Sequence, residues 1–308
     1  MALATASLFA CAMPLSFAWY FVWRLAAGVA GGVLMVLAAP TILTHVRPER
    51  RGVAGGVIFT GVGLGIAASG TLVPLLLRWG LVQTWVGLGV VATVLTAAAW
   101  NSWPAAPAPG DRPVADVAAP APTGRPLKAL YVAYGLDAFG LVPHMVFLVD
   151  FVARGLGRGL DTGGSYWVVF GAGALVGPVL AGALGDRIGF RAALRTAFAA
   201  QALLVGILAV TAAPGWLLTS SLVIGACVPG MVPLTLGRVH ELVGSHGPAR
   251  TAAWSRATAS FALGQAAAGY GLSFVYARTG DYAMLFALGA TALALALAID
   301  LTAGRGGR

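Results

Sequence analysis

Charged residues are scarce in this 308-residue chain, because Asp, Glu, Lys and Arg together make up only 9% of it. Soluble globular domains carry about 25% charged residues, so this scarcity argues against a soluble protein. The chain also has only 2 cysteines. Cys11 and Cys227 both lie in apolar stretches, without the spacing of a ligand pair. Neither a disulfide framework nor a cysteine metal site is therefore indicated.

Hydrophobic residues are abundant, at 59% of the chain. A helix that crosses a bilayer needs about 20 consecutive apolar residues. On that measure the apolar segments are 2–13, 16–44, 53–77, 82–101, 128–153, 163–184, 190–212, 215–238, 252–277 and 282–303. The first is too short to cross comfortably. The sequence therefore predicts an all-α integral membrane protein with about nine or ten transmembrane helices.

A proline-rich stretch divides the chain. Residues 104–127 contain prolines at 104, 107, 109, 113, 120, 122 and 126 among alanines and charges. Such a composition predicts a flexible, extended linker. It separates a front half, residues 1–103, from a six-helix back half, residues 128–303, which a short tail, 304–308, follows.

The net charge of +9 is distributed unevenly over the loops. Most basic residues fall in every second loop, so that they lie on one side of the predicted membrane. These residues are Arg47, Arg50, Arg51, Arg112, Arg125, Lys128, Arg187, Arg191, Arg195, Arg238, Arg250 and Arg256. Cytoplasmic loops of membrane proteins are enriched in Lys and Arg. We therefore expect the linker and the C-terminus in the cytoplasm. The basic charge then reports topology in a lipid bilayer, and no nucleic-acid partner is expected.

Three motifs carry a resemblance to a known family. The segment Gly185-Asp186-Arg187-Ile188-Gly189-Phe190-Arg191, between two spans, resembles the cytoplasmic signature loop of the major facilitator superfamily (MFS) of secondary transporters. Arg24, followed by Gly28 and Gly32, resembles the family's fourth-helix motif. The run from Gly61 to Gly70, which includes Gly65, resembles its glycine-rich fifth helix. With Tyr134-Gly135 and Pro143-His144, the chain is most similar to the YbfB/YjiJ branch.

The resemblance implies an MFS-type helical bundle that moves a small solute, such as an organic anion or a small hydrophobic compound, by alternating access. We expect protons to be coupled through Asp137 and His144, and we expect no cofactor, no metal and no enzymatic activity. The resemblance also implies a location in the bacterial cytoplasmic (inner) membrane. It assigns Gly185, Asp186, Arg187, Gly189 and Arg191 to a conformational switch, and Gly28, Gly32, Gly61, Gly65 and Gly70 to close helix packing.

The front half departs from the family pattern of twelve helices. The match begins inside the third helix, so we expect that the first two helices are lacking. Either the start codon is misassigned, or the gene is truncated and encodes a non-functional remnant of a transporter, which is an alternative to a working one. A membrane enzyme or sensor is the rival class. The sequence has neither the cluster of catalytic residues that an enzyme needs nor the soluble signalling domain of a sensor.

Arg24 is a charged residue within a predicted span, close to Trp19, Tyr20 and Trp23. Such a residue is costly in hydrocarbon unless it faces protein or a water-filled cavity. One interpretation is a cavity arginine that binds an anionic group or couples to an acid. The other is an arginine that extends to the outer interface beside its aromatic neighbours.

Asp137 and His144 share one predicted helix at a spacing of seven residues, which places them on one face. Buried carboxyl groups and imidazoles can exchange protons during a transport cycle. These two residues are therefore candidates for a proton-coupling pair. The alternative is a structural role for each. Asp150, farther along, is expected at the hydrated interface.

Three more residues are candidates for substrate contact. Gln201 and Gln265 lie near the middle of their spans, where an amide binds either a substrate or a neighbouring helix. Tyr134 is a candidate for a cavity lining. His240, Glu241 and His246 lie close together in sequence, but a solvated loop explains them better than a metal site does. The sequence gives no indication of the oligomeric state.

Overall fold

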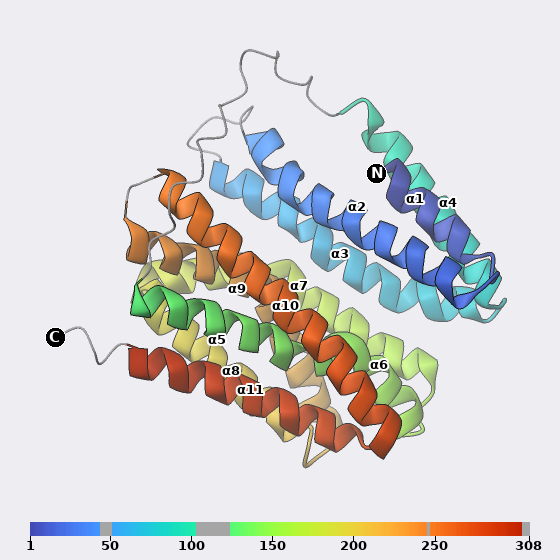
Figure 1. Ribbon diagram of the computed structural model, residues 1–308. Helices are drawn as coiled ribbons and strands as arrows, with labels where there is room; N and C mark the ends of the chain where they lie inside the picture. The colour runs from blue at the N-terminus through green and yellow to red at the C-terminus, as the bar shows by residue number, and fades with distance from the viewer. Residues whose placement is uncertain (44–50, 103–123, 245–246, 304–308) are drawn as a thin grey trace. The chain divides into compact units, whose positions relative to one another are not determined.

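The computed structural model describes residues 1–43, 51–102, 124–244 and 247–303, and all elements in these ranges are helical (Figure 1). The elements are α1 (Ala2–Cys11), α2 (Phe17–Leu43), α3 (Arg51–Leu77), α4 (Leu81–Trp100), α5 (Arg125–Val142), the π-helical turn η2 (Pro143–Phe147), α6 (Leu148–Asp150), the π-helical turn η3 (Phe151–Gly155), α7 (Leu160–Ile188), α8 (Phe190–Ile207), α9 (Pro214–Val243), α10 (Gly247–Thr279) and α11 (Tyr282–Ala303).

These helices confirm the all-α prediction, with bounds that differ from the expected ones by a few residues. Within the described ranges, 8 helices are long and apolar enough to cross a membrane. α1 is an apolar helix of only 10 residues, and α10, although 33 residues long, is more polar than those 8. Most of the predicted linker and all of the predicted tail lie outside the described residues.

The helix starts follow local sequence rules. Pro126 lies in the first turn of α5 and Pro214 opens α9, positions where a proline loses no helical hydrogen bond. α7 and α8 are separated by Gly189 alone, whose φ of +81° is one that side chains with a Cβ rarely adopt. This glycine therefore permits the abrupt turn between the two helices.

The chain forms two compact units. The first consists of residues 1–58 and 71–112, and the second of residues 59–70 and 113–308. In the first unit, α1 packs against α2 and α4. The indole Nε1 of Trp19 donates to the carbonyl of Ala10 at 2.9 Å, and the hydroxyls of Thr5 and Thr96 lie 3.1 Å apart.

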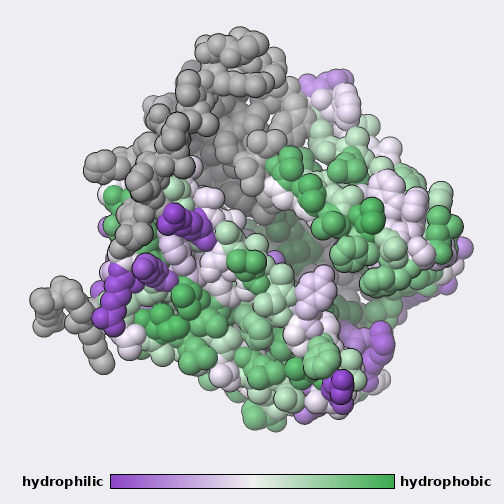
Figure 2. All heavy atoms as spheres, in the orientation of Figure 1, coloured by the Kyte–Doolittle hydropathy of each residue, from purple (hydrophilic) through white to green (hydrophobic). Residues whose placement is uncertain are grey.

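The second unit contains the larger core. α5 packs against α10 and α11, α7 packs against α9, and α8 packs against both α9 and α11. Two clusters of buried side chains fill the unit, one around Phe170 and Phe286 and the other around Phe198 and Met231. In Figure 2, hydrophobic residues cover much of the surface of the described helices, and hydrophilic residues form smaller groups. This distribution suits helices that lie in hydrocarbon.

The span from Arg125 to Gly155 is not a regular helix. The π-helical turns η2 and η3 flank the single short turn α6. Pro143, at the start of η2, has no N–H group to bond to the preceding turn. π-Helical turns inside α-helices occur frequently at functional sites. His144 and Asp150 lie in or beside these turns.

Glycines allow the closest helix contacts in the second unit. A Cβ at Gly173 or Gly177 of α7 would collide with the α9 backbone at Leu222 or Ala226. A Cβ at Gly225 of α9 would collide with the carbonyl of Phe170. α7 and α9 therefore meet backbone to backbone, as small residues permit in membrane helices.

Candidate functional site

The core of the second unit contains several fully buried polar side chains. Asp137, His144, Gln201, Ser220 and Thr235 each have an exposed fraction of 0%. They come from α5, η2, α8 and α9. Burial of polar groups is costly unless each finds a partner. Inside a membrane protein such residues are candidates for a functional site.

Asp137 is bonded by a neutral side chain. The Nε2 of Gln201 donates to the Oδ1 of Asp137 at 3.0 Å, and the same nitrogen lies 3.5 Å from the sulfur of Met231. The Oδ2 of Asp137 and the Oε1 of Gln201 are buried and have no hydrogen-bond partner among the described residues. An ionised Asp137 would therefore be a buried charge without a described cationic partner, a state that protonation relieves.

His144 has a separate set of partners. Its Nε2 lies 2.7 Å from the Oγ of Ser220, which donates to the carbonyl of Leu204 at 2.7 Å. The ring of Phe286 packs edge-on against the imidazole, with centroids 5.3 Å apart. The chain of contacts from His144 through Ser220 thus links η2 to α9 and α8.

The structure buries both members of the predicted pair but gives each its own hydrogen bond. Asp137 bonds to α8 and His144 to α9, and no contact between their side chains is among the described interactions. Coupling between them would therefore depend on charge or water rather than on a direct bond.

Tyr134 and Gln265 lie on the contact between α5, η2 and α10. Tyr134 is 3% exposed and packs on Phe261, with ring centroids 4.7 Å apart, and on Trp254. The Nε2 of Gln265 lies 3.5 Å from the sulfur of Met145. Both side chains make contacts between helices, and the assignment of either to substrate binding stays a prediction.

Arg24 lies in the first unit, on α2. Its guanidinium carbon is 5.6 Å from the centroid of the Trp85 ring on α4, which also packs against Tyr20. The side chain is exposed within the described structure. A cation over an indole face is an attractive contact, and no carboxylate partner of Arg24 occurs among the described residues. The aromatic neighbours expected from the sequence are therefore present, and the two interpretations of Arg24 both stay open.

The Gly185–Arg191 segment is helical apart from Gly189, so its description as a loop is wrong in detail. α7 continues through Ile188 because no residue before Gly189 breaks it. The ring of Phe190 fills the space where a Cβ at Gly185 or Gly237 would lie. Phe190 thus locks the end of α7 against α9.

Asp186 and Arg187 lie at the C-terminal end of α7. Asp186 and Arg187 are exposed and make no hydrogen bond or ion pair in the described part of the chain. Instead, the Oε1 of Glu241 accepts from the N–H of Phe190 at 3.2 Å, and Arg238 pairs with Glu241 at 2.7 Å. Glu241 therefore caps the start of α8, a role that suits an acidic side chain at a helix N-terminus.

The sequence argument missed two further ion pairs. Arg195 pairs with Asp300 at 2.6 Å and joins α8 to α11, while Asp150 pairs with Arg154 at 2.7 Å and accepts from the hydroxyl of Tyr282. Asp300 is an acidic residue inside an apolar span, so the rule that singled out Asp137 could have found it. Ser220 carried no such signal, because a serine in a span is common.

The predicted glycine contacts are only partly found. A Cβ at Gly70 would meet the carbonyl of Gly164 on α7, but a Cβ at Gly28, Gly32, Gly61 or Gly65 has no other described residue within 4 Å. Close contacts also lie at Gly63 of the same run, where a Cβ would meet the backbone of Leu175, and at Gly173, Gly177 and Gly225. A glycine motif identifies small residues, whereas the position of the neighbouring helix decides which of them are packed.

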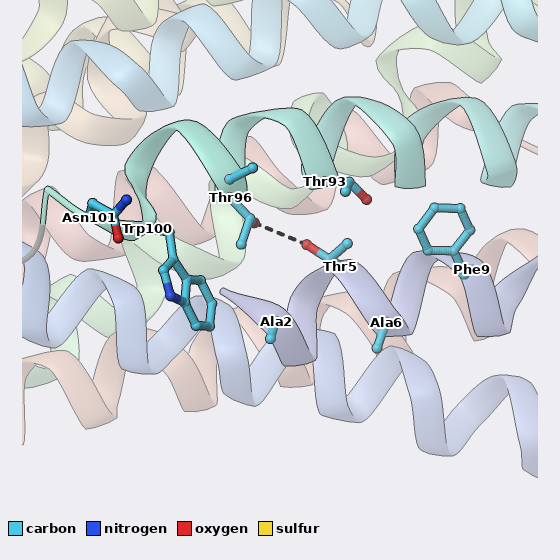
Figure 3. Close-up of a pocket in the computed structure, with 9 residues that line it drawn as sticks. Ala2, Thr5, Ala6, Phe9, Thr93, Thr96, Trp100 and Asn101 are labelled. Atoms are coloured by element: carbon cyan, nitrogen blue, oxygen red, sulfur yellow. Dashed lines mark hydrogen bonds between the residues drawn. The ribbon is translucent and has the colours of Figure 1, made fainter.

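A pocket in the first unit lies between α1 and α4 (Figure 3). Its lining is mostly apolar, with Phe9 and Trp100 at the sides and the bonded pair Thr5 and Thr96 between them. It contains none of the predicted site residues and no ionisable side chain. The buried polar residues of the second unit are therefore the better candidate site.

Comparisons with known proteins identify the family of this chain. A family model described as "Uncharacterised MFS-type transporter YbfB" matches residues 1–301. A structural relative is a bacterial homologue of the iron transporter ferroportin in an outward-facing state, with a TM-score of 0.52, 16% sequence identity, and coverage of 98% of this chain and 81% of that one. At this identity the likeness shows the fold alone. No curated protein matches the chain.

The family model spans nearly the whole sequence and confirms the resemblance drawn from the motifs. The structural likeness independently confirms an MFS-type helical fold. The chain is thus a multi-pass membrane protein that belongs to the YbfB family of MFS transporters.

Proposed function

We propose that this chain is a proton-coupled secondary transporter that works by alternating access in the bacterial cytoplasmic membrane. The observation that carries the proposal is the environment of Asp137. This carboxyl group is fully buried and bonded to the neutral amide of Gln201, and its second oxygen has no partner in the described ranges. Whether the carboxyl group of Asp137 binds a proton therefore depends on which side of the membrane supplies water to it.

This dependence is what coupling requires. In an alternating-access cycle the two end states expose a central site to opposite sides of the membrane. The charged form of a carboxyl group is costly where the group is buried and is stabilised where the group is hydrated. If the two end states differ in this way, binding of a proton changes the equilibrium between them. His144, buried on the same span, supplies a second titratable group.

The transported solute is proposed to be a small organic anion. Arg24 supports this choice, because a guanidinium over an indole ring is available to a carboxylate when no protein acid neutralises it. A small hydrophobic compound is the other candidate, since the helices of both units carry many exposed apolar side chains.

The test is solute-dependent proton movement. The purified chain would be reconstituted in liposomes that enclose a pH-sensitive dye, and succinate, citrate and a hydrophobic fluorescent dye would be added in turn. We expect at least one solute to accumulate in response to an imposed pH gradient and to move protons with it. Accumulation that follows a sodium gradient and ignores the pH gradient would contradict the proposal, as would the absence of any solute-dependent proton movement.

The orientation can be tested on a single helix. Leu160 and Ile188 lie at opposite ends of α7 and are 38% and 48% exposed. In a variant with Cys11 and Cys227 replaced by alanine, we expect Leu160→Cys to react with an impermeant maleimide in intact cells. Ile188→Cys should react only after the membrane is opened, because its end of α7 carries the basic residues. The reverse pattern would show that the assigned orientation is wrong.

A further inference from the structure

The hydrogen bonds of Ser220 determine which nitrogen of His144 carries its proton. A serine hydroxyl has one hydrogen to donate. The Oγ of Ser220 donates it to the carbonyl of Leu204 at 2.7 Å, and a carbonyl can only accept. Toward the Nε2 of His144, also at 2.7 Å, the same oxygen must therefore act as an acceptor. Nε2 is consequently the protonated nitrogen of a neutral imidazole.

The other nitrogen of His144 is then a buried acceptor without a donor. The Nδ1 of His144 has no hydrogen-bond partner in the part of the chain that the structure describes, and the residue is 0% exposed. Phe286 packs against the ring and restricts its rotation. A fully buried acceptor without a hydrogen bond costs free energy of folding. The hydrogen bond of Nε2 on the opposite side of the ring holds Nδ1 in this position.

Among the described residues, no charged group contacts the imidazole of His144. Its recorded contacts are Ser220 on α9 and Phe286 on α11, with the carbonyl of Leu204 on α8 beyond the serine. None of these groups is titratable. Asp137, seven residues earlier, bonds to Gln201, and Asp150, six residues later, bonds to Tyr282 and Arg154. Cys227 lies seven residues beyond Ser220 on α9.

We propose that Ser220 is a positioning residue that holds His144 in the Nε2–H tautomer, so that the buried Nδ1 is the atom of this second titratable group that takes up and releases a proton during the transport cycle. The inference rests on the proposed proton-coupled transport. The proton binds to the lone pair of Nδ1 and gives an imidazolium with an N–H on each nitrogen. The same proton later leaves from Nδ1. The Nε2–H bond to Ser220 persists through both steps, and no other bond is made or broken.

The tautomer can be measured directly in the full-length protein. Nitrogen-15 labelling of histidine, with His144→Gln used to assign the resonance, distinguishes a bare ring nitrogen from a protonated one. In the resting protein we expect a bare Nδ1 and a protonated Nε2. A proton on Nδ1 with Nε2 bare would overturn the inference without any transport measurement.

Matched serine variants test the consequence for transport. Ser221 is also fully buried, and its hydroxyl has no hydrogen-bond partner within the described ranges, so Ser221→Ala removes the same atoms without affecting His144. We expect Ser220→Ala to mix the two tautomers and to shift the pH profile of proton-driven uptake. We also expect it to lower the maximum uptake by roughly tenfold, which is less than the roughly 10²–10⁴-fold that a positioned proton-transfer group contributes. Ser220→Thr keeps the hydroxyl and should restore both the tautomer and the pH profile, while Ser221→Ala should match the wild type.

The outcomes separate the inference from the function on which it rests. If His144→Gln changes the pH profile but Ser220→Ala does not, and the variant keeps a bare Nδ1, only the role of Ser220 is overturned. If His144→Gln and Asp137→Asn both transport like the wild type, the proposed proton coupling fails and the inference fails with it. If Ser220→Ala does not fold, the nitrogen-15 spectrum of the wild type and the pH profile of Ser220→Thr decide.

Discussion

Replacement of Asp137 by asparagine is expected to abolish solute accumulation driven by a proton gradient while sparing exchange of solute across the membrane. Asparagine has the size of aspartate and keeps an oxygen that can accept from the Nε2 of Gln201, a bond of 3.0 Å in the structure. It lacks only the ability to bind and release a proton. We expect gradient-driven uptake to fall by about 100-fold or more, the scale set by loss of a positioned proton-transfer group.

The measurement is uptake into liposomes with and without a pH gradient, together with counterflow of solute at equal pH on both sides. Asp150→Asn is the control, because it removes a carboxylate of the same span that is partly exposed and paired with Arg154. We expect the control to accumulate solute. If Asp137→Asn accumulates solute as the wild type does, Asp137 has no part in coupling.

The second large effect concerns the contact between α7 and α9. Alanine at Gly177 would place its Cβ against the carbonyl of Ala226, which is backbone and cannot rotate away. The two helices would have to separate, and overpacking of this kind costs typically 1–3 kcal/mol and sometimes more. We therefore expect Gly177→Ala to lower the melting temperature in detergent and the yield of monodisperse protein.

Gly182 provides a control of the same chemistry on the same helix. A Cβ at Gly182 meets no other residue within 4 Å in the described part of the chain. Because alanine favours a helix over glycine by about 1 kcal/mol, Gly182→Ala should leave the stability unchanged or raise it. The two substitutions are thus expected to act in opposite directions. Equal melting temperatures for both variants would mean that α7 and α9 are not in backbone contact.

Hydrophobic run length was sufficient to predict the helices but not their internal irregularities. The segment 128–153 has the length and apolarity of one span, and only Pro143 signals a departure from regular geometry. The sequence has no further signal for the two π-helical turns, η2 and η3, which the structure shows on either side of α6.

The candidate site could likewise be predicted from the sequence only in part. Asp137 and His144 could be found because ionisable residues are rare in apolar spans. Their partners, Gln201 and Ser220, are joined to them across 64 and 76 residues of sequence. Gln201 drew attention as an amide in mid-span, whereas Ser220 resembles any small polar residue of a membrane helix. Only tertiary structure distinguishes it from Ser221.

The irregular span also bears on how such a site could arise in evolution. A π-helical turn holds one residue more than the α-helical turn it replaces, so each one rotates everything beyond it by about 100° around the helix axis. Asp150 follows one such turn and precedes another. Insertion of a single codon into a regular helix is therefore sufficient to turn this carboxylate, which accepts from Tyr282, around the axis while the residues before Pro143 stay where they were.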